Sequence, residues 1–131
     1  MLFLVSMIGC DFVFESFGGY EKKRDELPQM IQAIKKAEQD NFELLGFYVD
    51  AEAYPKTPGA DPQAWEIANS GGFVTIAWKP EDDVFGSYSV KVDGDDFVIK
   101  GVCDLDGDGI FASYTATKDT APVLTTPEDV Y

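Results

Sequence analysis

The stretch whose spacing most clearly suggests chemistry is CDLDGDGIF, residues 103–111. Asp104, Asp106 and Asp108 occupy alternate positions in it, and Gly109 follows the third of them. Calcium takes six to eight oxygen ligands, and loops of the form D-x-D-x-D-G supply several of these from closely spaced carboxylates. The three aspartates are therefore candidate ligands of a calcium ion, with Gly109 at the place where such a loop turns sharply.

The rest of the calcium pattern is incomplete. The main-chain carbonyl of Ile110 falls at the seventh place, which is a ligand place, but the twelfth place holds Thr115 where an EF-hand has a bidentate glutamate. Further ligands would have to come from elsewhere, and we expect Asp95 and Asp96, in the preceding DGDD turn (93–96), to contribute. The alternative is a plain β-turn, in which Asp and Gly supply the backbone angles. Three carboxylates so close repel one another unless they are screened, which favours an ion.

An enzymatic use of these carboxylates lacks partners in the sequence. The chain has no histidine, so Ser-His-Asp and Cys-His catalysis and His-ligated metals are excluded. No nucleophile elbow or phosphate-binding loop accompanies the acidic residues. The two cysteines, Cys10 and Cys103, fit no redox or metal motif and could form a disulfide or stay as thiols. The sequence predicts a protein that is not an enzyme and requires no cofactor, with Ca²⁺ as the one ion to consider.

Composition restricts the partners. A chain of 131 residues with 45% hydrophobic residues is enough for one domain with a core. The formal net charge of −14 should repel nucleic acid and anionic lipid headgroups. We therefore expect no nucleic-acid partner.

The elements that would position the acidic loop follow from local patterns. An amphipathic helix is expected over residues 21–46, with an apolar stripe facing a core and Lys35, Lys36, Glu38 and Gln39 mainly on the other side. A short helix is expected over 61–70, after a loop at 50–60. The strands expected between 73 and 117 are residues 73–78, 86–92, 96–103 and 110–117.

These elements define the expected fold class, which is α+β. A long N-terminal helix, interrupted near Gly18–Gly19, would pack on a four-stranded antiparallel meander. The tail APVLTTPEDVY would lie along the surface or the sheet edge.

The order of the elements and several motifs together resemble a type IV pilin. MLFLVSMIG resembles the middle of the hydrophobic pilin helix, and FGGYEKKRDELPQMIQAIKKAE resembles its continuation into the globular head. GFVTIAWKPEDDVFGSYSV and DLDGDGIFASYTATKD resemble head strands and the acidic turn of pilin-like proteins. The processing site of the family, a glycine before an apolar run with a glutamate, is absent, so we expect it upstream of Met1 or lost in a divergent member. Asp11 and Glu15 are unusual for that helix.

The resemblance implies a division at residue 20, with an apolar helix segment at 1–20 and a globular head at 21–131. It implies a structural subunit of a bacterial surface filament, a helical homopolymer that resides in the inner membrane before assembly and is extracellular afterwards. Two alternatives stay open: a soluble calcium-binding surface module or one anchored by a lipid on Cys10, and a minor pseudopilin of a secretion system. The side chains expected to pack between copies are Leu2, Phe3, Leu4, Val5, Met7, Ile8, Phe12 and Val13.

Overall fold

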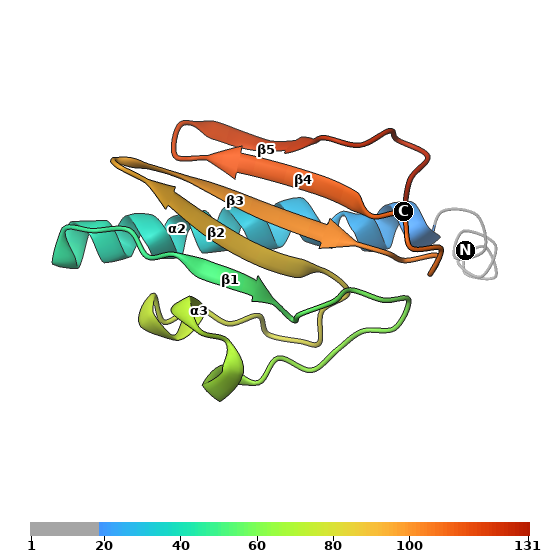
Figure 1. Ribbon diagram of the computed structural model, residues 1–131, viewed down its shortest axis with the longest axis horizontal. Helices are drawn as coiled ribbons and strands as arrows, with labels where there is room; N and C mark the ends of the chain where they lie inside the picture. Colours follow the sequence, from blue (N-terminus) through green and yellow to red (C-terminus); the bar gives the residue numbers. More distant parts are fainter. Residues whose placement is uncertain (1–18) are drawn as a thin grey trace, which may run out of the picture.

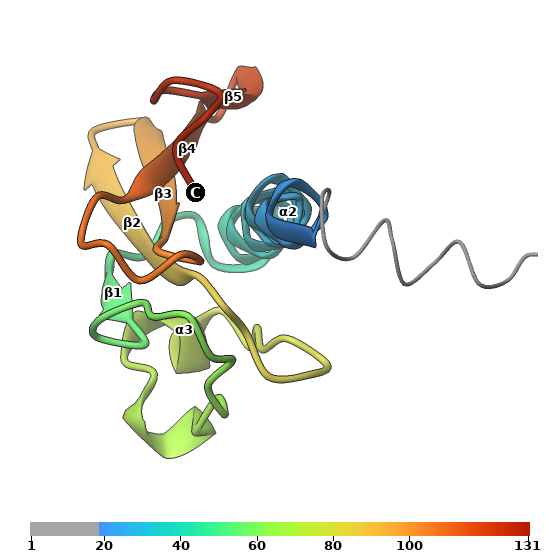
Figure 2. The ribbon, with the colours of Figure 1, turned by 90° about the vertical axis from the view of Figure 1, so that its right-hand side faces the viewer.

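The computed structural model describes residues 19–131, and the eight predicted assembly residues between Leu2 and Val13 lie outside this range. Helix α2 (Glu26–Leu45) crosses one face of a five-stranded antiparallel sheet with the strand order β1-β2-β3-β4-β5. Figure 1 shows the helix behind the sheet, and Figure 2 shows the same two layers in a view turned by 90°. The predicted α+β class is confirmed, and the sheet has one strand more than expected.

The helix forms as its pattern predicts. Helical residues 19–24 precede a turn at Asp25, and Pro28 then lies in the first turn of α2, where a missing N–H costs little. Gly46 ends the helix with a φ of 85°, and its N–H donates to the carbonyl of Phe42 at 2.7 Å. The inner side of the helix buries Leu27, Ile31 and Ile34 completely.

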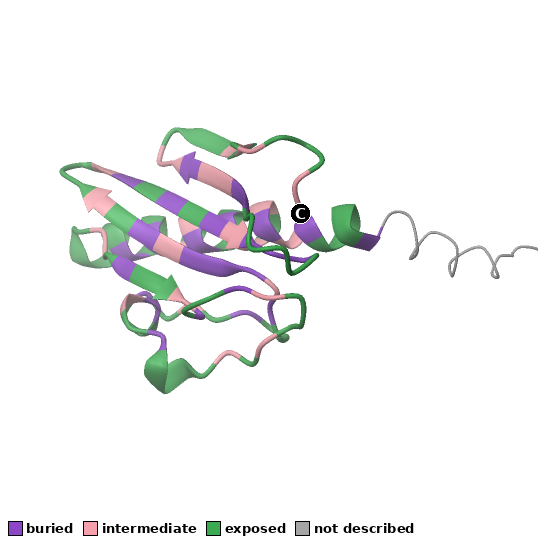
Figure 3. Cartoon of the chain, turned by 45° about the vertical axis from the view of Figure 1, so that its right-hand side comes forward, coloured by how far each residue is buried: buried purple, intermediate pink, exposed green. Residues whose placement is uncertain are grey.

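The central strands are β2 (Ser87–Asp93), β3 (Asp96–Cys103) and β4 (Ala112–Thr117). They confirm the strands expected at 86–92, 96–103 and 110–117, and the DGDD turn joins β2 to β3 with Asp93 paired to Asp96. Phe97 and Ile99 of β3 face α2, whereas Val98 between them is exposed on the outer face. Figure 3 shows this alternation as buried and exposed bands along the strands.

Two strands lie where the sequence predicted loop or tail. β1 (Ala51–Tyr54) pairs with β2, and β5 (Thr120–Leu124) pairs with β4 at the opposite edge. The Nζ of Lys35 donates to the carbonyl of Thr120 at 2.9 Å, which ties the helix to this edge. The sheet therefore spans residues 51–124 in place of the predicted 73–117.

The prediction for residues 61–78 is wrong in both of its parts. In place of a helix at 61–70, Gln63 forms an isolated bridge with Val84, and only η1 (Ile67–Asn69) is helical, with its side chains toward solvent. In place of a strand at 73–78, the chain forms α3 (Gly72–Thr75) followed by a turn. The physical reason is tertiary: Phe73 and Ile76 are both buried, and a spacing of three suits a helical turn.

Candidate functional site

The acidic loop connects β3 to β4 and turns twice with positive φ. Gly107 has a φ of 69° and Gly109 a φ of 83°, conformations that glycine adopts without steric cost. The N–H of Gly107 donates to the carbonyl of Asp104 at 3.2 Å. The sequence therefore places its glycines where the backbone of this loop requires them.

The side chains of the loop turn inward onto its own backbone. Asp104 accepts a hydrogen bond at Oδ2 from the N–H of Gly109, at 3.1 Å. Asp106 accepts at Oδ1 from the N–H of Asp108, at 3.3 Å, and Asp108 accepts at Oδ1 from the N–H of Ile110, at 2.8 Å. One carboxylate oxygen from each of the three aspartates lies within 4.8 Å of the others. The three predicted ligands are thus brought together.

The carboxylates have different electrostatic surroundings. Loss of solvation raises the pKa of Asp106, and the negative charges of Asp108 and Asp104 raise it further. The hydrogen bond from the N–H of Ile110 lowers the pKa of Asp108. Asp104 is the buried member, with 7% of its surface exposed, and its Oδ1 is buried without a hydrogen-bond partner.

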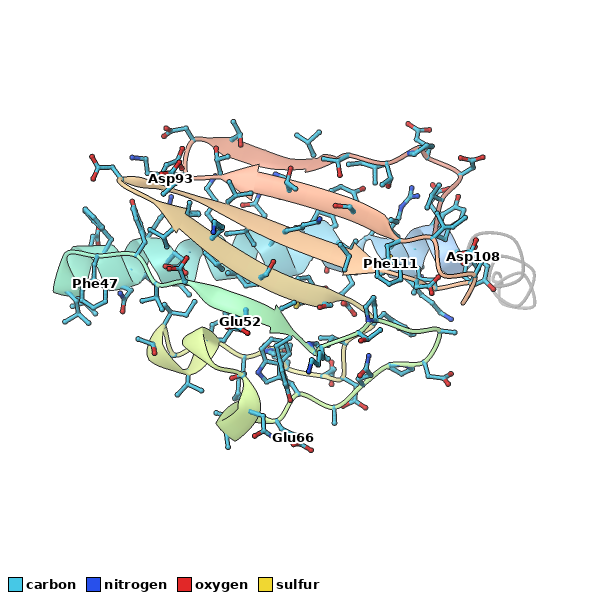
Figure 4. The ribbon with its side chains drawn as sticks, in the orientation of Figure 1. Phe47, Glu52, Glu66, Asp93, Asp108 and Phe111 are labelled. Carbon is cyan, nitrogen blue, oxygen red and sulfur yellow. The ribbon has the colours of Figure 1, made fainter. Side chains whose placement is uncertain are left out.

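The prediction that Asp95 and Asp96 complete this site is wrong. They lie at the start of β3 and the acidic loop at its end, so eight residues of strand separate them by roughly 25 Å. Figure 4 shows Asp93, from the same turn, and Asp108 at opposite ends of the sheet. Asp96 has a structural role instead: it accepts from the N–H groups of Phe97 and Lys118 at 2.7 and 3.1 Å, and these bonds lower its pKa.

The other residues singled out from the sequence are Ile110 and the two cysteines. Ile110 follows the three aspartates directly, and its role as a carbonyl ligand stays a prediction. Cys103 is buried at the end of β3, where loss of solvation raises the pKa of its thiol to about 12, so the thiol stays protonated at neutral pH. Cys10 lies outside the described residues, and its pairing or lipidation stays a prediction.

Two features of α2 and its C-terminal end were not predicted from the sequence. Glu38 was expected mainly on the solvent side but is fully buried, because it continues the stripe of Ile31 and Ile34 at the next helical spacing. At the end of the helix lies a cluster of exposed apolar side chains, and Figure 4 shows Phe47 at this tip of the molecule. The run NFELLGF could have revealed it, and the exposed members are Phe42, Leu44, Leu45 and Phe47.

Comparisons with known proteins do not place this chain in a family. No protein-family model, no curated protein and no solved structure matches this chain. Within residues 19–131, no helix combines the length and the apolar character needed to cross a bilayer.

Proposed function

We propose that this protein is the structural subunit of a bacterial, type IV pilus-like surface filament, and that it polymerises through its apolar N-terminal segment. The observation that carries the proposal is the way α2 joins the two parts of the chain. One side of α2 packs on β3, β4 and β5, and residues 19–24, which link the apolar segment to α2 in the sequence, are helical. A helix that leads from an apolar segment into an antiparallel head is the arrangement expected of such a subunit.

The packing of the head supports separate roles for α2 and for the apolar N-terminal segment. Leu27, Ile31 and Ile34 cover the inner sheet face, so α2 already supplies the apolar layer that this face needs. Residues 1–10 carry no charged side chain, whereas the whole chain has a net charge of −14. A segment without charge is the part of such a chain that can pack against its own copies with the least electrostatic repulsion.

The free energy expected from burying apolar side chains favours assembly through this segment. Each fully buried aliphatic or aromatic side chain contributes about 1.5–3 kcal/mol, so the eight predicted assembly residues contribute a gross gain of about 12–24 kcal/mol when they are fully buried. Repulsion between the acidic heads opposes this gain and is screened by salt. We therefore expect assembly to strengthen with ionic strength. A repeated contact between unlike surfaces generates an open helix, which is the geometry of a filament.

A pair of matched variants tests the proposal. Ile8→Lys and Val98→Lys each replace an apolar residue with lysine and change the net charge by the same amount, but Val98 lies exposed on the head. In sedimentation without detergent, the wild type and Val98→Lys should form large assemblies, and Ile8→Lys should stay monomeric. A monomeric wild type, or equal assembly of both variants, would overturn the proposal.

The rival, a lipid-anchored surface module, makes a different chemical prediction. Mass spectrometry of the native protein reads its N-terminus directly. Residues upstream of Met1 that begin with a methylated amino group would support the filament subunit, which should pass through the inner membrane before becoming extracellular. An acyl group on Cys10 would support the anchored module instead.

A further inference from the structure

The acidic loop contains a buried oxygen for which the described residues, 19–131, supply no donor. Asp104 has 7% of its surface exposed, and its Oδ1 accepts no hydrogen bond. A buried carboxyl oxygen without a donor or a counter-charge is costly. Among residues 19–131 the salt bridge that forms is the exposed pair Lys36–Asp40, so no Lys or Arg side chain of this range pairs with the loop.

We propose that the loop binds one calcium ion through Asp104, Asp106 and Asp108. Two oxygens bound to one calcium ion at 2.3–2.6 Å can be at most about 5 Å apart. One carboxylate oxygen from each of the three aspartates lies within 4.8 Å of the other two, so all three side chains can reach one ion. This inference goes beyond the filament role and does not depend on it.

The hydrogen bonds of the loop use one oxygen of each aspartate and leave its second oxygen for an ion. Asp104 uses Oδ2 to accept from Gly109, which leaves its unpartnered Oδ1 for the ion. Asp106 and Asp108 each use Oδ1 to accept a main-chain N–H, which leaves the second oxygen of each. Each aspartate therefore keeps one oxygen for an ion in addition to the oxygen that holds the loop backbone.

The donor set selects the kind of ion. All three ligands are carboxylate oxygens, which suit the hard cations Ca²⁺ and Mg²⁺ better than Zn²⁺ or Cu²⁺. Magnesium binds at 2.0–2.1 Å, which limits its oxygens to about 4.2 Å apart, and it dehydrates reluctantly. Three protein carboxylates with water filling the other positions resemble the weak sites of extracellular modules, so we expect a dissociation constant on the order of 10⁻⁴–10⁻³ M.

The test compares two variants with the same change in charge. Asp106→Asn removes an exposed ligand, and Asp95→Asn removes an exposed aspartate at the far end of β3. The full chain is freed of metal with a chelator and kept dispersed in non-ionic detergent, so the readout does not depend on filament assembly. Thermal unfolding is followed with calcium chloride, with magnesium chloride, and with sodium chloride at matched ionic strength.

At about ten times the dissociation constant, calcium should raise the Tm of the wild type and of Asp95→Asn by on the order of 5 °C relative to matched sodium chloride. Magnesium should raise it much less, and Asp106→Asn should lose the calcium effect. Calorimetric titration should give one calcium ion per chain. Equal shifts in both variants, equal effects of the two divalent ions, or no shift in the wild type would each overturn the inference, because general screening of an acidic surface would then explain the data.

Discussion

The buried carboxyl of Glu38 should make the stability of the head depend on pH in a predictable direction. Its Oε1 accepts a hydrogen bond from the N–H of Val49 at 2.8 Å, but its Oε2 is buried without a partner. Loss of solvation raises the pKa of Glu38 to about 7; the Val49 bond lowers it, and the nearby Asp50 charge raises it. We therefore expect a neutral carboxyl in the fold at mildly acidic pH.

The sign and size of the effect follow from proton linkage. Below pH 4.5 the carboxyl is protonated in both the folded and the unfolded chain, so the contribution to stability is fully present. Between pH 4.5 and about 7 the unfolded chain loses the proton while the folded chain keeps it, so the free energy of unfolding falls as the pH rises. Above pH 7 the loss levels off at about 3 kcal/mol, since one pKa unit corresponds to ~1.4 kcal/mol.

Glu38→Gln isolates this term, because the amide oxygen can still accept from Val49 but the group no longer titrates. Urea unfolding at pH 4.5 and pH 8, followed by tryptophan fluorescence in dispersing detergent, gives the free energy of unfolding at each pH. The variant minus wild-type difference should grow by about 3 kcal/mol between the two pH values, whatever constant offset the amide introduces. Glu43→Gln, on the exposed side of the same helix, is the control and should follow the wild-type curve. Parallel curves for Glu38→Gln and wild type would show that the carboxyl of Glu38 does not titrate with a raised pKa in the fold.

Two further substitutions test other contacts of the head. Arg24 is buried, donates from Nη1 to two carbonyls of the C-terminal tail at 2.7 and 2.8 Å, and lies 4.6 Å from the ring centre of Tyr131. Arg24→Lys should destabilise the fold by about 1–2 kcal/mol and speed amide exchange in the tail; unchanged exchange there would contradict the role given to Arg24. At Gly101 a Cβ would lie 2.9 Å from the ring of Tyr88, so Gly101→Ala should cost about 1–3 kcal/mol in urea unfolding. Gly59→Ala, where a Cβ meets nothing within 4 Å, should stay within about 0.5 kcal/mol of wild type, and equal effects at both sites would count against the packing argument.

Local sequence patterns correctly predicted the elements for which the local sequence and the tertiary packing favour the same structure. β3 begins and ends at the expected residues, because a run rich in β-forming residues lies between two turn signals and its alternate residues pack against α2. Gly46 ends the helix because only its left-handed conformation closes the last turn. β1 was missed because AEAY is short and carries little β propensity, and pairing with β2 supplies what the local sequence lacks.

For the candidate site as well, the local sequence predicted contacts within one loop but not the distance between separate turns. The three aspartates of one loop were predicted to lie together, and they do, because the loop turns at Gly107 and Gly109 and does not extend. Asp95 and Asp96 are close in sequence to that loop but not in space, since the intervening residues form an extended strand. Glu38 belongs to the apolar stripe by its spacing, but assigning it by residue type placed it in solvent.

Electron microscopy of native cells is the experiment that shows whether this chain builds the proposed surface filament. Antibodies raised against the head would be applied to material sheared from the cell surface, and the labelled protein identified by mass spectrometry. We expect gold particles along the length of thin filaments whose main component is this chain. Label confined to the cell envelope, on a monomer acylated at Cys10, would contradict it.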